Sequence, residues 1–147
     1  NRHGQRCRYV LNEAGDLGRF PDSHFDFILS LITLQHMPPD MAKGYLKEFV
    51  RVLGKGGVLI FQAAAERTAV PTGWVAGLGR AIGGLFPAGL CRTYRTLRHG
   101  HHIDMYGIPR EEVMKLLSEN GASVLEALED ISAGGEWTSF HYFAQKQ

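Results

Sequence analysis

Two nearly continuous apolar runs on either side of an amphipathic segment constrain the fold of this chain more than any other feature. The first run, FDFILSLI at residues 25–32, and the second, VLIFQAAA at residues 58–65, both suit strands covered on two faces. Between them, apolar residues recur at helical spacing over residues 41–53, and the glycines of GKGG at residues 54–57 can end a helix. This order predicts a βαβ unit, with two parallel strands and a right-handed crossover.

Length and composition fit one ordinary globular domain. The chain has 147 residues, 44% of them hydrophobic and 21% charged, which is enough for one core and too little for two ordinary domains. A formal net charge of +1 argues against nucleic acid or an anionic membrane as a partner, and no apolar run approaches the roughly 20 residues of a membrane span. Cys7 and Cys91 lie far apart without CxxC spacing, so we expect a cytoplasmic protein with free thiols, although the sequence leaves one disulfide open.

The C-terminal third predicts a helix and a hairpin. Residues 108–121, IPREEVMKLLSENG, should form a helix that begins near Pro109 and ends before Gly121. Two strands are expected over residues 122–131 and 137–146, close enough to pair as a hairpin. This arrangement would leave an antiparallel strand at the edge of the sheet.

Two other segments are less regular. Residues 7–12, CRYVLN, form a short β-prone run near the N-terminus. Residues 65–105 are rich in glycine, with arginine and aromatic residues between, and a structureless loop of that length would be unusual. We therefore expect an inserted cap or lid with short helices over residues 65–105.

The order of these motifs resembles the second half of class I S-adenosylmethionine-dependent methyltransferases of the methyltransferase type 11 kind. An acidic loop precedes a strand that begins Phe25-Asp26, and the helix ends in RVLGKGG at residues 51–57, where the family has RVLKPGG. GIPREEV, an NGA turn and two closing strands look like the approach to the family's sixth and seventh strands. The resemblance covers nearly the whole chain except residues 65–105. It implies an α/β fold, the C-terminal half of a Rossmann-like three-layer sandwich, with a mostly parallel sheet and an antiparallel terminal hairpin.

Two cofactor-binding features of that family do not occur in the sequence. There is no GxGxG turn, and no acidic residue closes an earlier strand to hold the ribose hydroxyls. We therefore expect residues 1–147 to be a single, partial methyltransferase domain, the alternative being a compact variant of the fold. Its affinity for S-adenosylmethionine should be poor, and an exposed sheet edge should favour a homo-oligomer or a partner fragment.

The resemblance places an adenine pocket near the N-terminus. Asn12, Glu13 and Ala14 occupy its position, with Glu13 accepting from the adenine amino group and Asp16 as the near alternative. A solvated acidic turn is the other interpretation of Glu13.

A second group of cofactor contacts is expected at the end of the FD strand. Ser30, Leu31 and Ile32 lie at the carboxyl edge, where open α/β sheets bind ligands and where the family contacts the methionine part of the cofactor. For Leu31 and Ile32 the alternative is a place in the core.

His36 follows this strand end and is the candidate catalytic residue. Histidine titrates near neutral pH and can act as a general base, and the family often has histidine here. The alternatives are a buried, hydrogen-bonded histidine or a residue that shapes the helix entry. No metal is expected, because RHGHH at residues 98–102 has no carboxylate or thiolate at a ligand spacing.

These features predict an S-adenosylmethionine-dependent methyltransferase for a small molecule, here in a truncated form that is inactive alone. The sulfonium is already activated, so such a site mainly aligns the nucleophile with the methyl group, and the sequence need not show a catalytic pair. One alternative is a non-catalytic methyltransferase-like module that acts through oligomerisation or partner binding. Another is a different nucleotide-binding α/β protein, such as a dehydrogenase, which the FD strand and the terminal hairpin disfavour.

Overall fold

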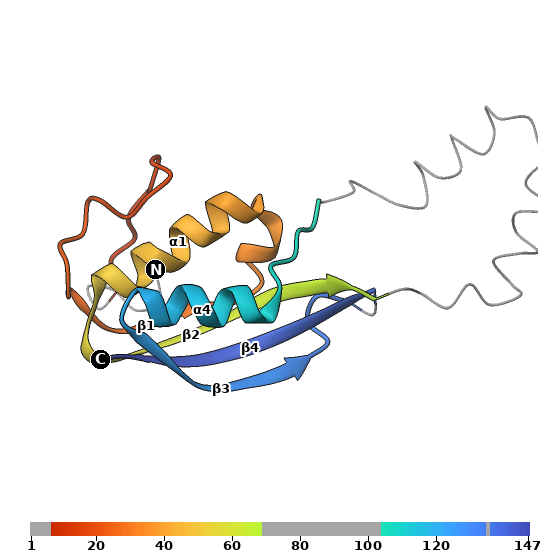
Figure 1. Cartoon of the computed structure of the whole chain (residues 1–147). Coiled ribbons are helices and arrows are strands. Elements are labelled where there is room, and N and C mark those ends of the chain that lie inside the picture. The colour runs from red at the N-terminus through yellow and green to blue at the C-terminus, as the bar shows by residue number, and fades with distance from the viewer. Residues whose placement is uncertain (1–6, 69–103, 135) are drawn as a thin grey trace, which may run out of the picture.

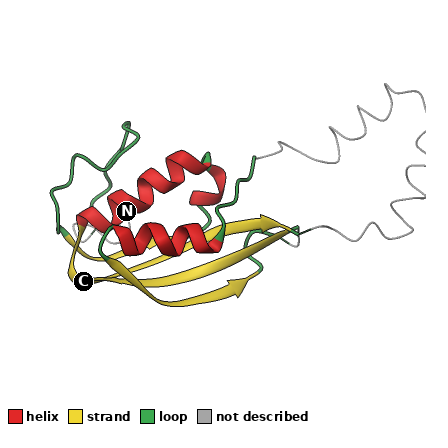
Figure 2. Cartoon of the chain, viewed as in Figure 1, coloured by secondary structure: helices red, strands yellow, loops and turns green. Residues whose placement is uncertain are grey.

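The computed structural model describes residues 7–68, 104–134 and 136–147. Within these ranges, four strands form one sheet in the order β1-β2-β4-β3, and the helices pack on one of its faces (Figures 1 and 2). The elements are, in chain order, β1 (Phe25–Ser30), the 3-10 helix η2 (Leu34–His36), α1 (Pro39–Val52), β2 (Leu53–Arg67), α4 (Arg110–Glu119), β3 (Ala122–Asp130) and β4 (Trp137–Lys146). The arrangement is α/β, as the sequence predicts.

The sheet confirms the βαβ unit but differs in the place of its antiparallel strand. β1 and β2 are parallel, with Ile28 paired to Leu59. β4 pairs antiparallel with both β2 and β3, so it lies inside the sheet. β3 forms the edge of the sheet and runs in the same direction as β1 and β2. Burial explains the difference: Tyr142 and Ala144 of β4 are fully buried, whereas Leu128 of β3 is exposed. β4 has more apolar surface to bury than β3 and therefore takes the inner position.

The junction between α1 and β2 has no glycine cap. Leu53 follows the helix directly in extended conformation and is the first residue of β2. The last helical carbonyl groups accept from other donors, Arg51 O from Ser23 N at 3.0 Å and Val52 O from His24 N at 2.7 Å. The left-handed glycine of the GKGG pattern is Gly56, with a φ of 77°, and it lies within β2.

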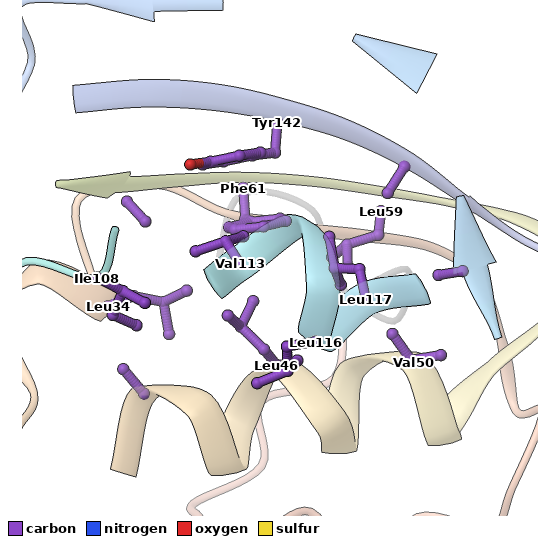
Figure 3. Close-up of a cluster of buried hydrophobic side chains, with 14 of the residues drawn as sticks. Leu34, Leu46, Val50, Leu59, Phe61, Ile108, Val113, Leu116, Leu117 and Tyr142 are labelled. Carbon is purple, nitrogen blue, oxygen red and sulfur yellow. The ribbon is translucent and has the colours of Figure 1, made fainter. Parts of the chain in front are cut away.

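The core lies between the sheet and the two helices (Figure 3). The rings of Phe61 and Tyr142, from neighbouring strands, stack with centroids 4.8 Å apart and an interplanar angle of 9°. Apolar side chains of both helices cover this pair, as their helical spacing predicts. They are Ala42, Leu46 and Val50 of α1 and Val113, Leu116 and Leu117 of α4.

No helix of the described residues covers the opposite face of the sheet (Figure 2). On β1, Ile28 packs against the core, so Phe27 and Leu29 point to the other face, where they are 53% and 55% exposed. The described residues therefore show two of the three layers of the expected sandwich.

Two segments differ from the sequence pattern or extend beyond what is described. Residues 7–12 form no strand, and Tyr9 and Leu11 are exposed there. Because β propensity largely reflects packing on a half-buried sheet, exposed side chains gain little from pairing. Of the expected cap, residues 65–67 belong to β2, and residues 69–103 lie outside the described residues. Among the helices of the described ranges, none is long and apolar enough to cross a membrane.

Candidate functional site at the carboxyl end of β1

The backbone is strained where the chain leaves β1. Ser30, the last residue of the strand, is buried, whereas Leu31 and Ile32 are 44% and 53% exposed and do not join the core. Ile32 has a φ of 55°, in the left-handed region that β-branched residues rarely adopt. Strain of this kind gathers at binding and switch sites, which motivates a site hypothesis at this edge of the sheet.

A chain of hydrogen-bonded side chains lies beside the strained segment. Gln62 of β2 lies one residue beyond the point where β1 stops pairing. Its Nε2 donates to Gln35 Oε1 at 3.0 Å, and Gln35 Nε2 lies 3.3 Å from His36 Nε2. His36 Nδ1 in turn lies 3.3 Å from the backbone oxygen of Asp104. Gln62 is fully buried, Gln35 is 4% exposed, and His36 is at the surface, so the chain runs from the interior to solvent.

The segment that leads into α4 holds this chain from outside. Tyr106 N donates to the backbone oxygen of Gln35 at 2.8 Å, and Ile108 N to that of Ala64 at 2.9 Å. Between these two bonds, a Cβ on Gly107 would lie only 2.1 Å from a β2 carbonyl oxygen, so only glycine fits. The close approach fixes Asp104 and its oxygen near His36.

His36, the predicted catalytic residue, has both ring nitrogens engaged. The oxygen of Asp104 can only accept, so in a neutral ring Nδ1 carries the proton and Nε2 accepts from Gln35. To act as a base, His36 would have to exchange Gln35 for a substrate proton. The geometry fits a positioning role, and catalysis by His36 stays a prediction.

The predicted adenine contacts lie elsewhere, on the side of α1. Asn12 Nδ2 donates to the backbone oxygens of Ala14 and Asp16 at 3.1 and 2.8 Å, which closes the loop on itself. The hydroxyl of Tyr45 donates to Ala14 O at 3.2 Å, and the side chain of Glu13 is exposed. Figure 1 shows this loop beside α1, away from the carboxyl ends of β1 and β2. The structure therefore does not bring these residues to the strand end, and their part in cofactor binding stays a prediction.

Arg51, from the RVLGKGG motif, ties the acidic loop to α1. It bonds the carboxylates of Glu48 at 2.8 Å and Asp22 at 2.6 Å, and it donates to the backbone oxygens of Leu17 and Phe20. The hydrogen bonds to Glu48 and Asp22 raise the pKa of Arg51, and the same contact lowers the pKa of Glu48. Two features that carry the family resemblance are thus joined for a structural reason.

A polar cluster at the β3–β4 hairpin was not foreseen from the sequence. His141 Nδ1 lies 2.9 Å from Asp130 Oδ2, and the hydroxyls of Ser132 and Ser139 donate to the same carboxylate. Burial raises the pKa of Asp130, but the two hydroxyl donors and the charge of His141 outweigh it, so the pKa is lowered overall. Ser139 donates to Asp130 rather than to the histidine, so the cluster does not activate a serine nucleophile.

The pocket at the amino end of α4 lies apart from the predicted site. It has a volume of about 500 Å³ and is lined by Glu66, Pro109, Arg110, Glu111 and Met114. Its lining mixes both charges and contains none of the predicted site residues. Among the described residues, no group of three or more His, Cys, Asp or Glu could hold a metal ion, and the RHGHH run at residues 98–102 lies outside them.

Sequence reasoning also missed Gln35 and Gln62. The available signal was the polar residue within VLIFQAAA, since a glutamine in a buried strand needs hydrogen-bond partners. Its partner lies 27 residues earlier in the chain, so the pairing appears only in the fold.

The family model for the methyltransferase domain matches residues 1–61, fewer than half of the 147 residues. No curated protein matches the chain in sequence. The match includes β1, η2, α1 and β2 up to Phe61. It therefore includes the strand end but stops one residue before Gln62.

Solved methyltransferase structures share the fold at low identity. The 1,6-didemethyltoxoflavin-N1-methyltransferase of Burkholderia thailandensis, with bound 1,6-didemethyltoxoflavin and S-adenosylhomocysteine, has a TM-score of 0.61 and 16% identity, over 99% of this chain and 53% of its own. A SAM-dependent methyltransferase of Methanosarcina mazei has a TM-score of 0.57 and 19% identity, over 93% of this chain and 66% of its own. The magnesium protoporphyrin IX methyltransferase of Synechocystis PCC 6803, with bound SAH, has a TM-score of 0.51 and 20% identity, over 85% of this chain and 46% of its own. This chain thus spans about half the length of the first and the third.

Proposed function

Because the described residues form part of a class I methyltransferase-like domain, we propose that this chain belongs to an S-adenosylmethionine-dependent methyltransferase that acts on a small molecule. The carrying observation is the strained carboxyl end of β1, where Ile32 is exposed and where Gln62 of β2 lies one residue beyond the last strand pair. Open α/β sheets bind ligands at this edge. The Burkholderia and Synechocystis enzymes are named for small-molecule acceptors, which supports the substrate class.

The strand end fits part of the cofactor. Gln62 Oε1 is a buried acceptor without a hydrogen-bond partner among the described residues, and S-adenosylmethionine carries N–H and O–H donors. Leu31 and Ile32 add exposed apolar surface at the same end of β1. The loop that holds Glu13 does not reach this edge, so we expect weak binding by this chain.

The chemistry asked of the protein is modest. When bound, S-adenosylmethionine supplies an activated methyl group. Residues at the strand end then need to orient the two reactants and exclude water. In this proposal His36 positions the edge through Gln35, and Ser30, Leu31 and Ile32 contact the cofactor.

Calorimetric titration of the chain with S-adenosylmethionine and S-adenosylhomocysteine tests the proposal. We expect measurable binding, in the micromolar to millimolar range. Glu13→Ala should weaken it if Glu13 contacts the adenine, and should leave it unchanged if the strand end alone holds the cofactor. Glu126→Ala, which removes another exposed carboxylate far along the chain on β3, is the matched control and should leave binding unchanged. A folded chain that gives no heat with either ligand would rule out cofactor binding by this chain.

The exposed face of β1 favours a second candidate, a non-catalytic module that binds a partner or a second copy. Phe27 and Leu29 lie on a face that no described helix covers. Such apolar surface commonly marks an interaction site. Sedimentation equilibrium should then show an oligomer that Leu29→Lys dissociates, and a monomer that binds S-adenosylhomocysteine would contradict this candidate. A cytoplasmic location belongs to both proposals and rests on the cysteine spacing.

A further inference from the structure

We propose that Gln62 selects ligands that present an N–H or O–H donor at the carboxyl edge of the sheet, and that His36 sets this polarity through Gln35. The inference rests on the proposed function, because it takes the same edge as the ligand site. Gln62 is fully buried, and its Oε1 has no hydrogen-bond partner among the described residues. Buried acceptors are nearly always paired, so an unpaired one marks a place for a ligand group or a water molecule.

The orientation of the Gln35 and Gln62 side-chain amides follows from one backbone oxygen, that of Asp104. Asp104 O can only accept, and it lies 3.3 Å from His36 Nδ1, so Nδ1 of the neutral ring carries the proton. His36 Nε2 is then an acceptor, and the Gln35 atom 3.3 Å away must be the amide nitrogen. Gln35 Oε1 consequently faces Gln62, which must turn its own nitrogen toward that oxygen, at 3.0 Å. The atom left over at the end of the chain is therefore an oxygen.

The reversed orientation does not fit a neutral histidine. If both amides were turned round, Gln35 Oε1 would face His36 Nε2, and Asp104 O would still face Nδ1. Two acceptors would then need two ring protons, which only a charged imidazolium has. With a neutral ring, each group in the chain has one consistent role.

The cross-strand neighbour of Gln62 does not supply the missing donor. Phe61 and Ala63 pack in the core, so Gln62 points to the other face of the sheet, where it pairs in register with His141. His141 Nδ1 lies 2.9 Å from the Asp130 carboxylate, and no hydrogen bond joins His141 to Gln62 Oε1 among the described residues. Gln62 Oε1 can therefore still accept a hydrogen bond from a group inserted at the strand end.

An acceptor at Gln62 Oε1 favours ligands that carry a hydrogen-bond donor over ligands that carry only acceptors. A hydroxyl or an N–H amine can donate to Gln62 Oε1, whereas an ether or a carboxylate would place lone pairs against it. When a hydroxyl is methylated, the methyl group comes from the sulfonium, which becomes a thioether, and the proton is released to water. The ether that forms has no hydrogen to donate, so the same oxygen favours the unmethylated acceptor over its product.

The first experiment tests the polarity without any ligand. Nitrogen NMR of the full chain at pH 8 should show His36 with a protonated Nδ1 and an unprotonated Nε2. Gln35→Met removes the donor to Nε2 and should shift the Nε2 resonance and mix the two tautomers. A wild-type ring protonated on Nε2 would overturn the proposed polarity, whatever the chain binds.

The second experiment tests the selection with a matched pair of probes. Phenol carries an O–H donor, and anisole is its methyl ether. The Gln62 side-chain amide resonance, assigned by its loss in Gln62→Met, should move with phenol, and phenol should bind about tenfold more tightly than anisole. Gln62→Met should reduce that ratio to about twofold or less, while Gln145→Met, on the neighbouring strand, should keep it. If Gln62→Met does not fold, Gln35→Met serves instead, since it releases the orientation of Gln62.

A third titration, with S-adenosylhomocysteine, separates the two sources of the donor. A Gln62 shift with S-adenosylhomocysteine but not with phenol assigns the donor to the cofactor and supports the inference. Equal shifts with phenol and anisole would overturn it, because contact would then be apolar. No shift with any probe, together with a bound water detected at the Gln62 amide, would overturn it as well. Neither of these results would exclude cofactor binding measured by calorimetry. The proposed function and the role of Gln62 are therefore tested independently.

Discussion

Removing one oxygen from the core, by Tyr142→Phe, should not weaken the fold. The Tyr142 hydroxyl is buried without a hydrogen-bond partner among the described residues, and Figure 3 shows it pointing toward the carboxyl end of β2. A buried hydroxyl without a partner costs about 1–3 kcal/mol in mutational data. Tyr142→Phe keeps the stack on Phe61 and removes this cost, so the free energy of unfolding should rise by about 1 kcal/mol.

Urea unfolding followed by circular dichroism measures the change, and a higher midpoint at an unchanged slope is expected. Tyr45→Phe is the matched control, because the Tyr45 hydroxyl donates to Ala14 O at 3.2 Å and accepts from Asn12 at 3.3 Å. The control should lose about 0.5–1.5 kcal/mol. A loss of more than about 1 kcal/mol in Tyr142→Phe would refute the reasoning and point to a buried water on the hydroxyl.

The same variant should alter alkaline unfolding. Burial raises the pKa of Tyr142 from 10.0 to about 12, despite the opposing charge of Arg110. Between these two values the unfolded chain releases this proton first, so the free energy of unfolding falls as the pH rises. The resulting loss of unfolding free energy over this range is on the order of a few kcal/mol at most. Tyr142→Phe should flatten that part of the pH profile, and an unchanged profile would contradict the burial of the hydroxyl.

Three further changes test the packing, the close approach at the strand end and the hairpin cluster. Leu46 is fully buried, so Leu46→Ala should lower the free energy of unfolding by about 2–5 kcal/mol in urea. Met41→Ala, at an exposed position of the same helix, is the control. Equal losses of unfolding free energy in the two variants would contradict the position of α1. Gly107→Ala would place a Cβ 2.1 Å from a β2 carbonyl oxygen and should abolish hydrogen-exchange protection of the flanking amides; retained protection would show that the approach is looser. The pKa of Asp130 is lowered in the folded chain, so its contacts stabilise the fold above the ordinary carboxyl pKa and are lost as the pH falls through the folded value. Asp130→Asn should therefore weaken the fold at pH 7 and remove this acid dependence in pH-dependent thermal melts, and an unchanged acid limb would mean that another carboxylate governs it.

Local patterns predicted the elements well, because each signal lies within a few residues of its effect. The apolar runs gave β1 and β2, and the helical spacing around Leu46 gave α1 to within two residues at each end. The prediction of an antiparallel strand at the edge of the sheet was wrong, because the order of the strands depends on competition between distant surfaces. Tyr142 buries its ring on Phe61, more than 80 positions earlier, and no local pattern of β4 states that preference.

The strand end itself was predicted, but the polar chain beside it was not. Ser30 to Ile32 follow from the end of an apolar run, which the sequence shows directly. Gln62 meets Gln35 across 27 positions, and His36 meets the Asp104 oxygen across 68. A single sequence can flag a glutamine inside a strand as unusual, but it cannot say which group that glutamine satisfies.

The hydrogen bond between His36 and Gln35 orients Gln62, but it also occupies the nitrogen that His36 would need to act as a base. As a base, His36 would need Nε2 free of Gln35, yet that bond is what orients Gln35 and, through it, Gln62. A ring that takes a proton on Nε2 becomes a donor there, so the Gln35 amide must turn and Gln62 must follow. The acceptor at Gln62 Oε1 would then be replaced by an N–H donor. A chain that selects its ligand through Gln62 therefore gains from a histidine that stays neutral, and the same contact that polarises the site restrains His36 as a base.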